Sequence, residues 1–476
     1  MNFNVLTEPW IPARLPDGSI REYGVLELLE HAHELVEITD AMPNYEFGMY
    51  RFLFVFLMDA YRPKRQRDIR NLLESGHFDM DVIQTYVEEC NRNGERFDLL
   101  DEWHPFLQQA TGWEENTEEK SPANLNPALP SGNNHVHFDH TVEADSVMSP
   151  SEAVKALCAI NLFSAAGVQG YPSTPSGAPP VYTIVQGNNL FETLSFGMVP
   201  SQLLDRYDDP PAVWRYNGAI QAKNKTASTS LLFGLMFPCR RIRLCSLKDG
   251  LVTGILFEQG MNYENYDAWT DPYVTYTEGK KGRQNLKPNM DKENWRNLGT
   301  ILNTDNGAPY VITQAVGFDT LQVLTLITYS AVTNQMNYLD LQRGNYCVPV
   351  SFVESPILFQ FLCSLLENVE TEGDRLSKSI YILQKDLGST EGASAAERTR
   401  TINRFYFRCK KTFFEFIDRT LKEDDIASLS EEWQHMIRTV RWLEYNTFVD
   451  RLGNSSRMML EAERVKKQNR RREERI

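Results

Sequence analysis

The chain has 476 residues, with 49 Lys and Arg against 64 Asp and Glu, so its formal net charge is −15. Hydrophobic residues make up 42% and charged residues 24% of the chain, which excludes wholesale disorder. The length predicts two or three domains. The acidic balance opposes non-specific binding of nucleic acid over the whole surface, so any such contact must come from local basic patches.

The cysteines and the N-terminus narrow the class of protein further. The seven cysteines are scattered and form no CxxC pair, which argues against a disulfide framework and against a thiolate zinc site. The first residues show no basic segment followed by an apolar one, and the longest apolar run, residues 52–58, is too short to cross a bilayer. We therefore expect a soluble, cytoplasmic protein that does not bind a membrane.

The first third of the chain predicts short strands followed by helices. Residues 10–14 are expected to be extended and residues 25–35 have helical spacing. Residues 44–61 are apolar on nearly every side, which is typical of a buried helix. A basic run at 62–70 follows, and residues 114–144 are polar and rich in Asn, Pro and Ser, which predicts a long loop.

The middle of the chain mixes one capped helix with strands. Ser149 is expected to cap a helix that runs through 153–166, with Glu152 in its first turn. An irregular Gly/Pro-rich segment comes next, and residues 279–294 look like a basic, polar linker. Strand-like runs are expected at 181–185, 241–244, 251–257 and 310–315.

The character of the sequence changes after residue 355. Segments with a 3.6-residue hydrophobic period, joined by short polar connections, predict an antiparallel four-helix bundle; they are residues 357–369, 375–387, 396–421 and 429–448. Residues 461–476 are strongly charged and are expected to be a helix extension or a frayed end. The predicted fold class is α+β, with a mixed α/β N-terminal domain of residues 1–355 and a C-terminal bundle of residues 356–476.

One motif points to metal chemistry. Residues 135–140, His-Val-His-Phe-Asp-His, match the HxHxDH ligand pattern of metallo-β-lactamase-fold hydrolases. A binuclear site needs further ligands, but after His140 only His435 follows, and a polar loop rather than an apolar strand precedes the motif. Phosphate-binding, dinucleotide-binding and nucleophile-elbow motifs are absent. We therefore expect no enzyme activity, no metal and no cofactor.

The order of several short segments resembles the CasA family, the large subunit of the type I-E CRISPR surveillance complex Cascade. The resemblance extends over nearly the full length, and it depends on the order of the segments rather than on any one of them. The segments that carry it are WIPAR near the N-terminus, 103–108, SGNNHVHFDH at 131–140, 156–163, 181–189, 333–335 and 404–407.

The resemblance implies a protein that binds but does not cut. It would recognise the protospacer-adjacent motif (PAM) of double-stranded DNA through the minor groove, start strand separation and support pairing of a guide RNA with its target, forming an R-loop. Its implied partners are the handle-capping, backbone and small subunits of Cascade, the guide RNA, the target duplex, and a helicase-nuclease or nuclease domain that cuts.

The resemblance assigns the strand-separating wedge to a hairpin tip. Thr333, Asn334 and Gln335 lie at the matching place, and a glutamine amide can replace hydrogen bonds of the base that it displaces. It also assigns minor-groove contact to a loop of small residues that lets the backbone approach the bases. The matching residues are Gly170, Tyr171, Pro172, Ser173 and Thr174, in which Tyr171 and Pro172 replace expected glycines.

A lysine that reaches the groove is a third family element, but residues 257–263 hold none; Gln259 or Asn262 could replace it as donor, or the role could be lost. The loop near the guide handle and the motif would contribute Asn134, His137, Phe138 and Asp139, with Phe138 able to stack on a splayed base.

Basic residues could hold backbone phosphates. The candidates are Arg62, Lys64, Arg65, Arg67, Lys223, Lys225, Lys280 and Lys281, and in the helical region Arg404, Arg408, Lys410, Lys411 and Arg441. Two alternatives remain open, a zinc-dependent hydrolase that uses the His motif and a purely structural assembly subunit.

Overall fold

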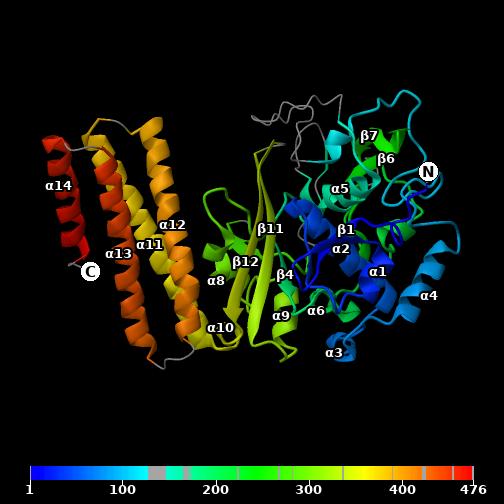
Figure 1. The fold of residues 1–476 in the computed structure, drawn as a ribbon, viewed down its shortest axis with the longest axis horizontal. Coiled ribbons are helices and arrows are strands. Elements are labelled where there is room, and N and C mark those ends of the chain that lie inside the picture. The colour runs from blue at the N-terminus through cyan, green and yellow to red at the C-terminus, as the bar shows by residue number, and fades with distance from the viewer. Residues whose placement is uncertain are drawn as a thin grey trace. The chain divides into compact units, whose positions relative to one another are not determined.

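The structure is a computed structural model that describes residues 2–126, 146–164, 171–172, 174–221, 225–265, 269–280, 282–334, 337–388, 390–420, 425–452 and 455–473. The chain folds into two compact units, one formed by Met1–Asn294 and Thr300–Tyr346 and the other by Trp295–Gly299 and Cys347–Ile476. Both helices and sheets contribute, so the expected α+β class is confirmed (Figure 1). No helix in these described ranges is long and apolar enough to span a membrane.

Helix α2 (Pro43–Tyr61) forms the centre of the first unit. Nearly all of its side chains are buried, so the predicted buried helix is confirmed. The helix packs on α5 (Pro150–Phe163), and Gly48 permits this close approach because a Cβ there would lie 2.9 Å from the backbone nitrogen of Ala159. Aromatic rings cover the remaining sides of α2.

Helix α5 begins as the sequence predicts. The Ser149 hydroxyl accepts the backbone N–H of Glu152 at 3.2 Å, and the Glu152 carboxylate accepts the backbone N–H of Ser149 at 2.9 Å. This reciprocal arrangement is a capping box, which pairs backbone N–H groups that the first turn of a helix leaves without a partner.

A three-stranded sheet carries the hairpin expected near residue 333. Its order is β12 (Asn337–Pro349), β11 (Val323–Asn334) and β4 (Tyr182–Gln186), and β11 runs antiparallel to β4 with Ile327 opposite Ile184. The middle of β11 is buried and contacts α2. The sheet therefore joins the hairpin to the hydrophobic core.

Shorter elements surround this centre. Strands β1 (Ile11–Arg14), β2 (Ile20–Tyr23) and β3 (Glu37–Ile38) form one small sheet, and β6 (Arg240–Lys248) pairs with β7 (Leu251–Gln259), which confirms the two strands predicted there. Other short elements of the first unit include α1 (Val25–Glu30), α3 (Gln66–Ser75), α4 (Met80–Asn91), α6 (Leu190–Phe196), β5 (Lys225–Thr226), α7 (Leu231–Leu235) and β8 (Asn262–Tyr263). Helix α8 (Leu298–Ile301) has residues in both units, and α10 (Ser351–Glu354) belongs to the second unit.

The strand predicted at 310–315 is wrong, because this segment forms helix α9 (Tyr310–Val316). Its β-branched residues favour a strand locally, but the buried residues Val311, Ile312 and Ala315 are spaced as one face of a helix. Tertiary burial outweighs the weak local preference.

The linker predicted at 279–294 is also wrong in part. Strands β9 (Tyr276–Gly279) and β10 (Gly282–Asn285) form an antiparallel hairpin in which Gly279 lies opposite Gly282. Gly282 has a φ of +98°, a conformation that favours glycine, so the residue type suits the turn.

The second unit is helical, but its first long helix does not follow the predicted segments. The two helices expected at 357–369 and 375–387 are one continuous helix, α11 (Pro356–Asp386). The polar residues between them remain helical because side chains of the same unit engage them. Arg296 Nε donates to the Glu370 carboxylate at 2.9 Å, and a Cβ at Gly373 would collide with the Tyr406 hydroxyl.

Three further helices complete the second unit, and Figure 1 shows them beside α11. Helices α12 (Ala393–Thr420) and α13 (Ile426–Leu452) confirm the helices predicted at 396–421 and 429–448. The charged tail is largely helix α14 (Ser456–Glu473), which contacts α11 and α13 and buries Val465. It is a packed element rather than a frayed end.

Candidate nucleic-acid interface

The β11–β12 hairpin is anchored by a buried carboxylate. Glu46 on α2 accepts the Tyr329 hydroxyl at 2.5 Å and Arg343 Nε at 2.8 Å, and Arg343 also contacts the carboxylate of Glu37 at 3.2 Å. Burial raises the pKa of Glu46 above its ordinary value, while the Arg343 charge and the hydrogen bonds oppose that rise. Because Tyr329 lies on β11 and Arg343 on β12, this carboxylate holds both strands to the core.

The far end of the same hairpin is exposed. β11 ends at Asn334, which is exposed, after the half-buried Thr333, and β12 begins at Asn337. Gln335, the predicted wedge residue, lies outside the described residues. The structure therefore places two of the three predicted wedge residues at the end of an anchored hairpin.

The described part of the predicted glycine loop is held by β6. Arg240 Nη1 donates to the carbonyl oxygen of Pro172 at 2.6 Å, and its guanidinium lies 4.8 Å from the centre of the Tyr171 ring. Pro172 and Thr174 are buried and Tyr171 is half-buried. These side chains pack against the protein, so a groove contact here would have to involve the backbone. Gly170 and Ser173 lie outside the described residues.

A hollow of about 450 Å³ lies between the segment after this loop and the β9–β10 hairpin. Its wall includes the small residues Ser176, Gly177 and Ala178. Trp269 Nε1 donates to the Ser176 hydroxyl at 3.1 Å, and the Asn285 side chain donates to the Ser176 carbonyl oxygen. The hairpin and this small-residue segment are thus held together, although about 100 residues of sequence separate them.

The β9–β10 hairpin presents cations at this hollow. Arg283 and Lys287 line it, and both side chains are exposed. Arg283 lies over the Tyr276 ring at 3.7 Å and donates to the Thr270 hydroxyl at 3.0 Å, which orients its guanidinium. Lys280 is exposed where the hairpin turns, and Lys281 lies outside the described residues.

Sequence reasoning missed that this basic stretch packs beside the small-residue segment. The signal that was available is Gly-Lys-Lys-Gly at 279–282, because two residues between glycines in strand-like surroundings predict a tight hairpin turn. Residues 257–263, where the resemblance places the groove lysine, end β7 and form β8, and Gln259 and Asn262 there are half-buried.

The basic run 62–70 is partly neutralised within the chain. Arg62 pairs with Asp59 at 3.2 Å and with Asp208 at 3.4 Å, and it has a left-handed φ of 45° at the end of α2. The side chains of Lys64, Arg65 and Arg67 are exposed. Of the four predicted phosphate contacts in this run, Arg62 is therefore paired with acidic side chains and the other three are exposed without such a pair in the described part of the chain.

The second predicted pair of phosphate contacts is also partly neutralised. Lys225 Nζ lies 2.9 Å from the Glu264 carboxylate, and this hydrogen bond raises the pKa of Lys225 above its ordinary value. Lys223 lies outside the described residues.

The His motif at 135–140 and the predicted handle-loop residues lie outside the described residues; the latter are Asn134, His137, Phe138 and Asp139. Within the residues that the structure does describe, no group of three His, Cys, Asp or Glu side chains could hold a metal ion.

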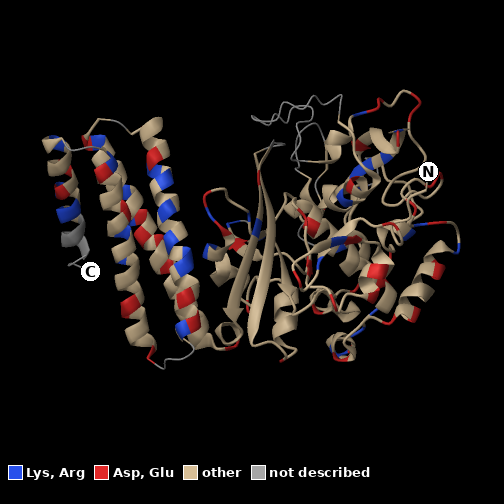
Figure 2. Cartoon of the chain, in the orientation of Figure 1, with Lys and Arg blue, Asp and Glu red and all other residues tan. Residues whose placement is uncertain are grey.

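Three arginines of the second unit, Arg404, Arg408 and Arg441, pair with buried carboxylates. Glu444 is buried and accepts Arg404 Nε at 3.0 Å and Arg408 Nε at 2.6 Å. Arg441 is buried and lies 2.9 Å from Glu372. Figure 2 shows acidic and basic residues along the same helices. The sequence marked these arginines as possible DNA contacts, and in the structure each of them pairs with a carboxylate on another helix.

Comparison with known proteins identifies the family of this chain. Residues 4–442 match the family model of CRISPR-associated protein Cse1. A curated relative, CRISPR-associated protein CasA/Cse1 of Thermus thermophilus, is 30% identical over 371 residues, which are 73% of this chain and 71% of the relative.

Solved structures share the fold over nearly the whole chain. The crystal structure of Thermus thermophilus CasA has a TM-score of 0.81 at 23% identity and covers 99% of both chains. A chain from a structure described as a CRISPR RNA-guided surveillance complex also has a TM-score of 0.81, at 17% identity, and covers 98% of this chain and 99% of that one. The matched family model and the curated relative together show that this chain belongs to the Cse1 (CasA) family, that of the large subunit of the type I-E CRISPR Cascade complex.

Proposed function

We propose that this chain recognises the PAM in double-stranded DNA for an RNA-guided Cascade complex. It contacts the minor groove, starts strand separation with Gln335 and supports R-loop formation, and a separate nuclease then cuts the target. Residues 1–355 carry recognition. Helices α11 to α14 form an antiparallel four-helix bundle of residues 356–476 that contacts the other subunits. The family and the resemblance to a surveillance-complex structure support guide RNA and Cascade subunits as partners.

The observation that carries this proposal is the β11–β12 hairpin. Unstacking a base step costs a few kcal/mol. A side chain that is inserted there must therefore be held by a rigid support, because a flexible one would move aside instead. Glu46 ties Tyr329 and Arg343, one on each strand, to the central helix α2, while Asn334 at the other end is exposed. An anchored root and an exposed, amide-rich end are the properties that a wedge needs.

The β9–β10 hairpin supports the choice of the minor-groove surface. Ser176, Gly177 and Ala178 offer little side-chain bulk beside the exposed cations Arg283 and Lys287. Small residues let backbone approach base edges, and cations hold the flanking phosphates. We assign to Lys280 on this hairpin the groove-facing role for which residues 257–263 contain no lysine.

Duplex binding by the guide-loaded complex tests the wedge. Gln335→Ala should weaken binding to a duplex that carries the PAM and slow strand opening, measured by gel shift and by a fluorescent base analogue beside the PAM. A duplex whose bases are already unpaired at that step should restore binding, because strand separation by Gln335 is then not needed. Gln322→Ala is the matched control, since Gln322 is an exposed glutamine directly before the first residue of β11, at the end of the strand away from Gln335.

The alternatives give different outcomes. A purely structural assembly subunit would tolerate Gln335→Ala and Lys280→Gln without loss of PAM-dependent binding, provided that the complex still assembles. A zinc-dependent hydrolase would contain stoichiometric zinc that His137→Ala removes. Either result would contradict the proposed function.

A further inference from the structure

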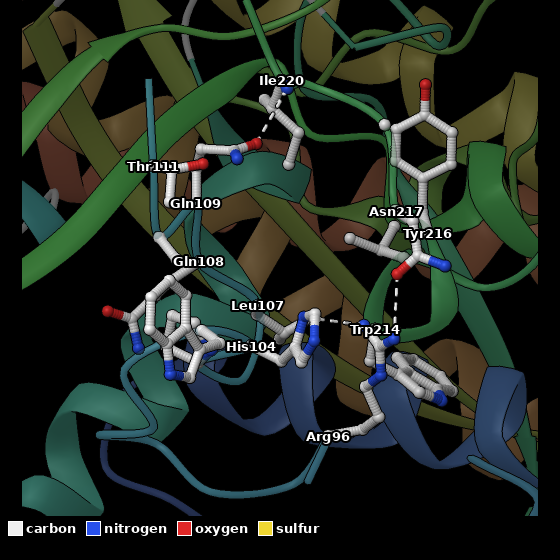
Figure 3. Close-up of a pocket in the computed structure, with 15 residues that line it drawn as sticks. Arg96, His104, Leu107, Gln108, Gln109, Thr111, Trp214, Tyr216, Asn217 and Ile220 are labelled. Atoms are coloured by element: carbon white, nitrogen blue, oxygen red, sulfur yellow. Dashed lines mark hydrogen bonds between the residues drawn. The ribbon is translucent and has the colours of Figure 1, made fainter. Parts of the chain in front are cut away.

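A second hollow in the first unit has none of the wedge, small-residue or basic hairpin residues in its wall. Its volume is about 390 Å³, within the range of small-molecule sites, and it is lined by residues from the stretches 96–111 and 213–220 (Figure 3). The inference drawn from it is independent of the proposed DNA recognition.

A buried arginine without a carboxylate partner lines this hollow. Arg96 is 5% exposed, and its guanidinium donates from Nη1 to His104 Nδ1 at 3.1 Å and from Nη2 to Asn217 Oδ1 at 2.8 Å (Figure 3). Burial lowers the pKa of Arg96, but a guanidinium keeps its charge at neutral pH. In the described part of the chain no acidic oxygen lies within 4 Å of it, so its charge has only neutral partners.

The neutral side chains around Arg96 keep N–H groups that can donate to a ligand. A guanidinium can only donate, so His104 accepts at Nδ1 and carries its proton on Nε2; burial, followed by the Arg96 charge, lowers the pKa of His104 and favours this neutral form. The Asn217 oxygen is occupied by Arg96, and the Gln109 oxygen accepts the backbone N–H of Ile220 at 2.9 Å. The amide groups of both side chains therefore retain their N–H donors.

Among the described residues, none of those that line the hollow is acidic, although the whole chain carries a net charge of −15. Asp101 is close enough to influence Arg96, but its carboxylate accepts the backbone N–H groups of Trp103 at 2.9 Å and His104 at 2.5 Å. A buried cation and several N–H donors without an acid favour an anionic ligand with several acceptor oxygens.

An aromatic surface accompanies the cation. Trp103 lines the hollow and is 65% exposed, which is unusual for a side chain of this size. An exposed indole offers a stacking surface that suits a nucleobase. We propose that this hollow binds a nucleotide, with its phosphate on Arg96 and its base on Trp103. The nucleotide is either a free mononucleotide or part of a strand.

Calorimetric titration of the purified full-length chain tests the proposal. We expect AMP to bind and adenosine not to bind, because the phosphate supplies the charge. Trp103→Ala should weaken AMP at least about fivefold and leave inorganic phosphate unchanged. A five-nucleotide RNA that binds more tightly than AMP would assign the site to a strand, and the reverse order would assign it to a free nucleotide.

Asn217→Asp tests the role of the Arg96 charge while the arginine itself stays in place. It places a carboxylate 2.8 Å from Arg96 with almost no change of shape, so it should raise the midpoint of thermal unfolding and abolish AMP binding. Arg92→Gln removes an exposed arginine that does not line the hollow and serves as the control, with AMP binding unchanged.

Three results would overturn the proposal. They are equal binding of AMP and adenosine, undiminished AMP binding by both Asn217→Asp and Arg96→Gln, and binding of an acidic peptide by a chain that ignores AMP and RNA. The last result would assign the hollow to a protein carboxylate instead.

Discussion

Two basic stretches that look alike in the sequence differ in the folded chain. In residues 62–70, Arg62 pairs with Asp59 and Asp208, and Arg70 donates to the Gly317 carbonyl oxygen at 2.7 Å. In residues 280–287, no acidic partner contacts Lys280 or Lys287 in the described part of the chain, and both side chains are exposed.

The difference shows that local charge does not by itself identify a phosphate-binding surface. A cation already paired with a buried carboxylate must leave that partner before it can hold a phosphate, whereas a solvated lysine only releases counterions. Arg62 and Arg70 of the first stretch therefore contribute to folding, whereas its other predicted phosphate contacts, like Lys280 and Lys287, stay exposed to solvent.

Asp59→Asn should have the largest effect. Its carboxylate is 1% exposed and contacts Arg62 and Arg215, each at 3.2 Å or less, and the Tyr86 hydroxyl at 2.9 Å. Neutralising it leaves the half-buried Arg215 without a carboxylate and Arg62 with only the exposed Asp208, so the free energy of unfolding should fall by about 3 kcal/mol. Urea unfolding measures this. Asp208→Asn, at an exposed partner of Arg62, should change it by less than about 1 kcal/mol.

The double change Lys280→Gln and Lys287→Gln should have the next largest effect, and on DNA binding rather than stability. Each lysine that contacts a phosphate contributes about 1 to the slope of log affinity against log salt, so the slope should fall by about 2. Titration of the guide-loaded complex with duplex at several salt concentrations measures it. An unchanged slope would remove this hairpin from the interface.

Arg62→Gln should have a smaller effect, and only on stability. Its side chain is 49% exposed and Arg215 still pairs with Asp59, so the free energy of unfolding should fall by about 0.5–1 kcal/mol. The salt slope should stay the same. A slope reduced as much as in the hairpin variant would erase the distinction between the two stretches.

Lys225→Gln should have the smallest effect. Glu264 already compensates the charge of this exposed lysine, so neither the salt slope nor the unfolding midpoint should change measurably. Glu264→Gln releases the lysine and should slightly strengthen binding of any duplex, which repeated salt titrations would detect. Weaker binding in Lys225→Gln would instead identify this residue as a phosphate contact.

The sequence predicted where along the chain the parts of the candidate interface lie, because the family resemblance rests on the order of short segments. It did not predict the contacts between those parts. The resemblance located the hairpin that ends at Asn334, and the structure confirms strands on both sides of position 335. It could not show that Glu46 anchors that hairpin, because the carboxylate and Arg343 are almost 300 residues apart in the sequence. The hollow around Arg96 had no sequence signal, since its lining comes from two separate loop stretches.

The sequence by itself determined the elements whose cause is local. Residues 44–61 are apolar on nearly every side, which favours burial, and Ser149 with Glu152 caps a helix through neighbouring atoms. Tertiary structure decided the other elements, because contacts with residues distant in the sequence stabilise them. Arg296 and Arg441 keep the polar residues of 370–374 helical within α11, and core burial turns 310–316 into a helix despite its β-branched residues.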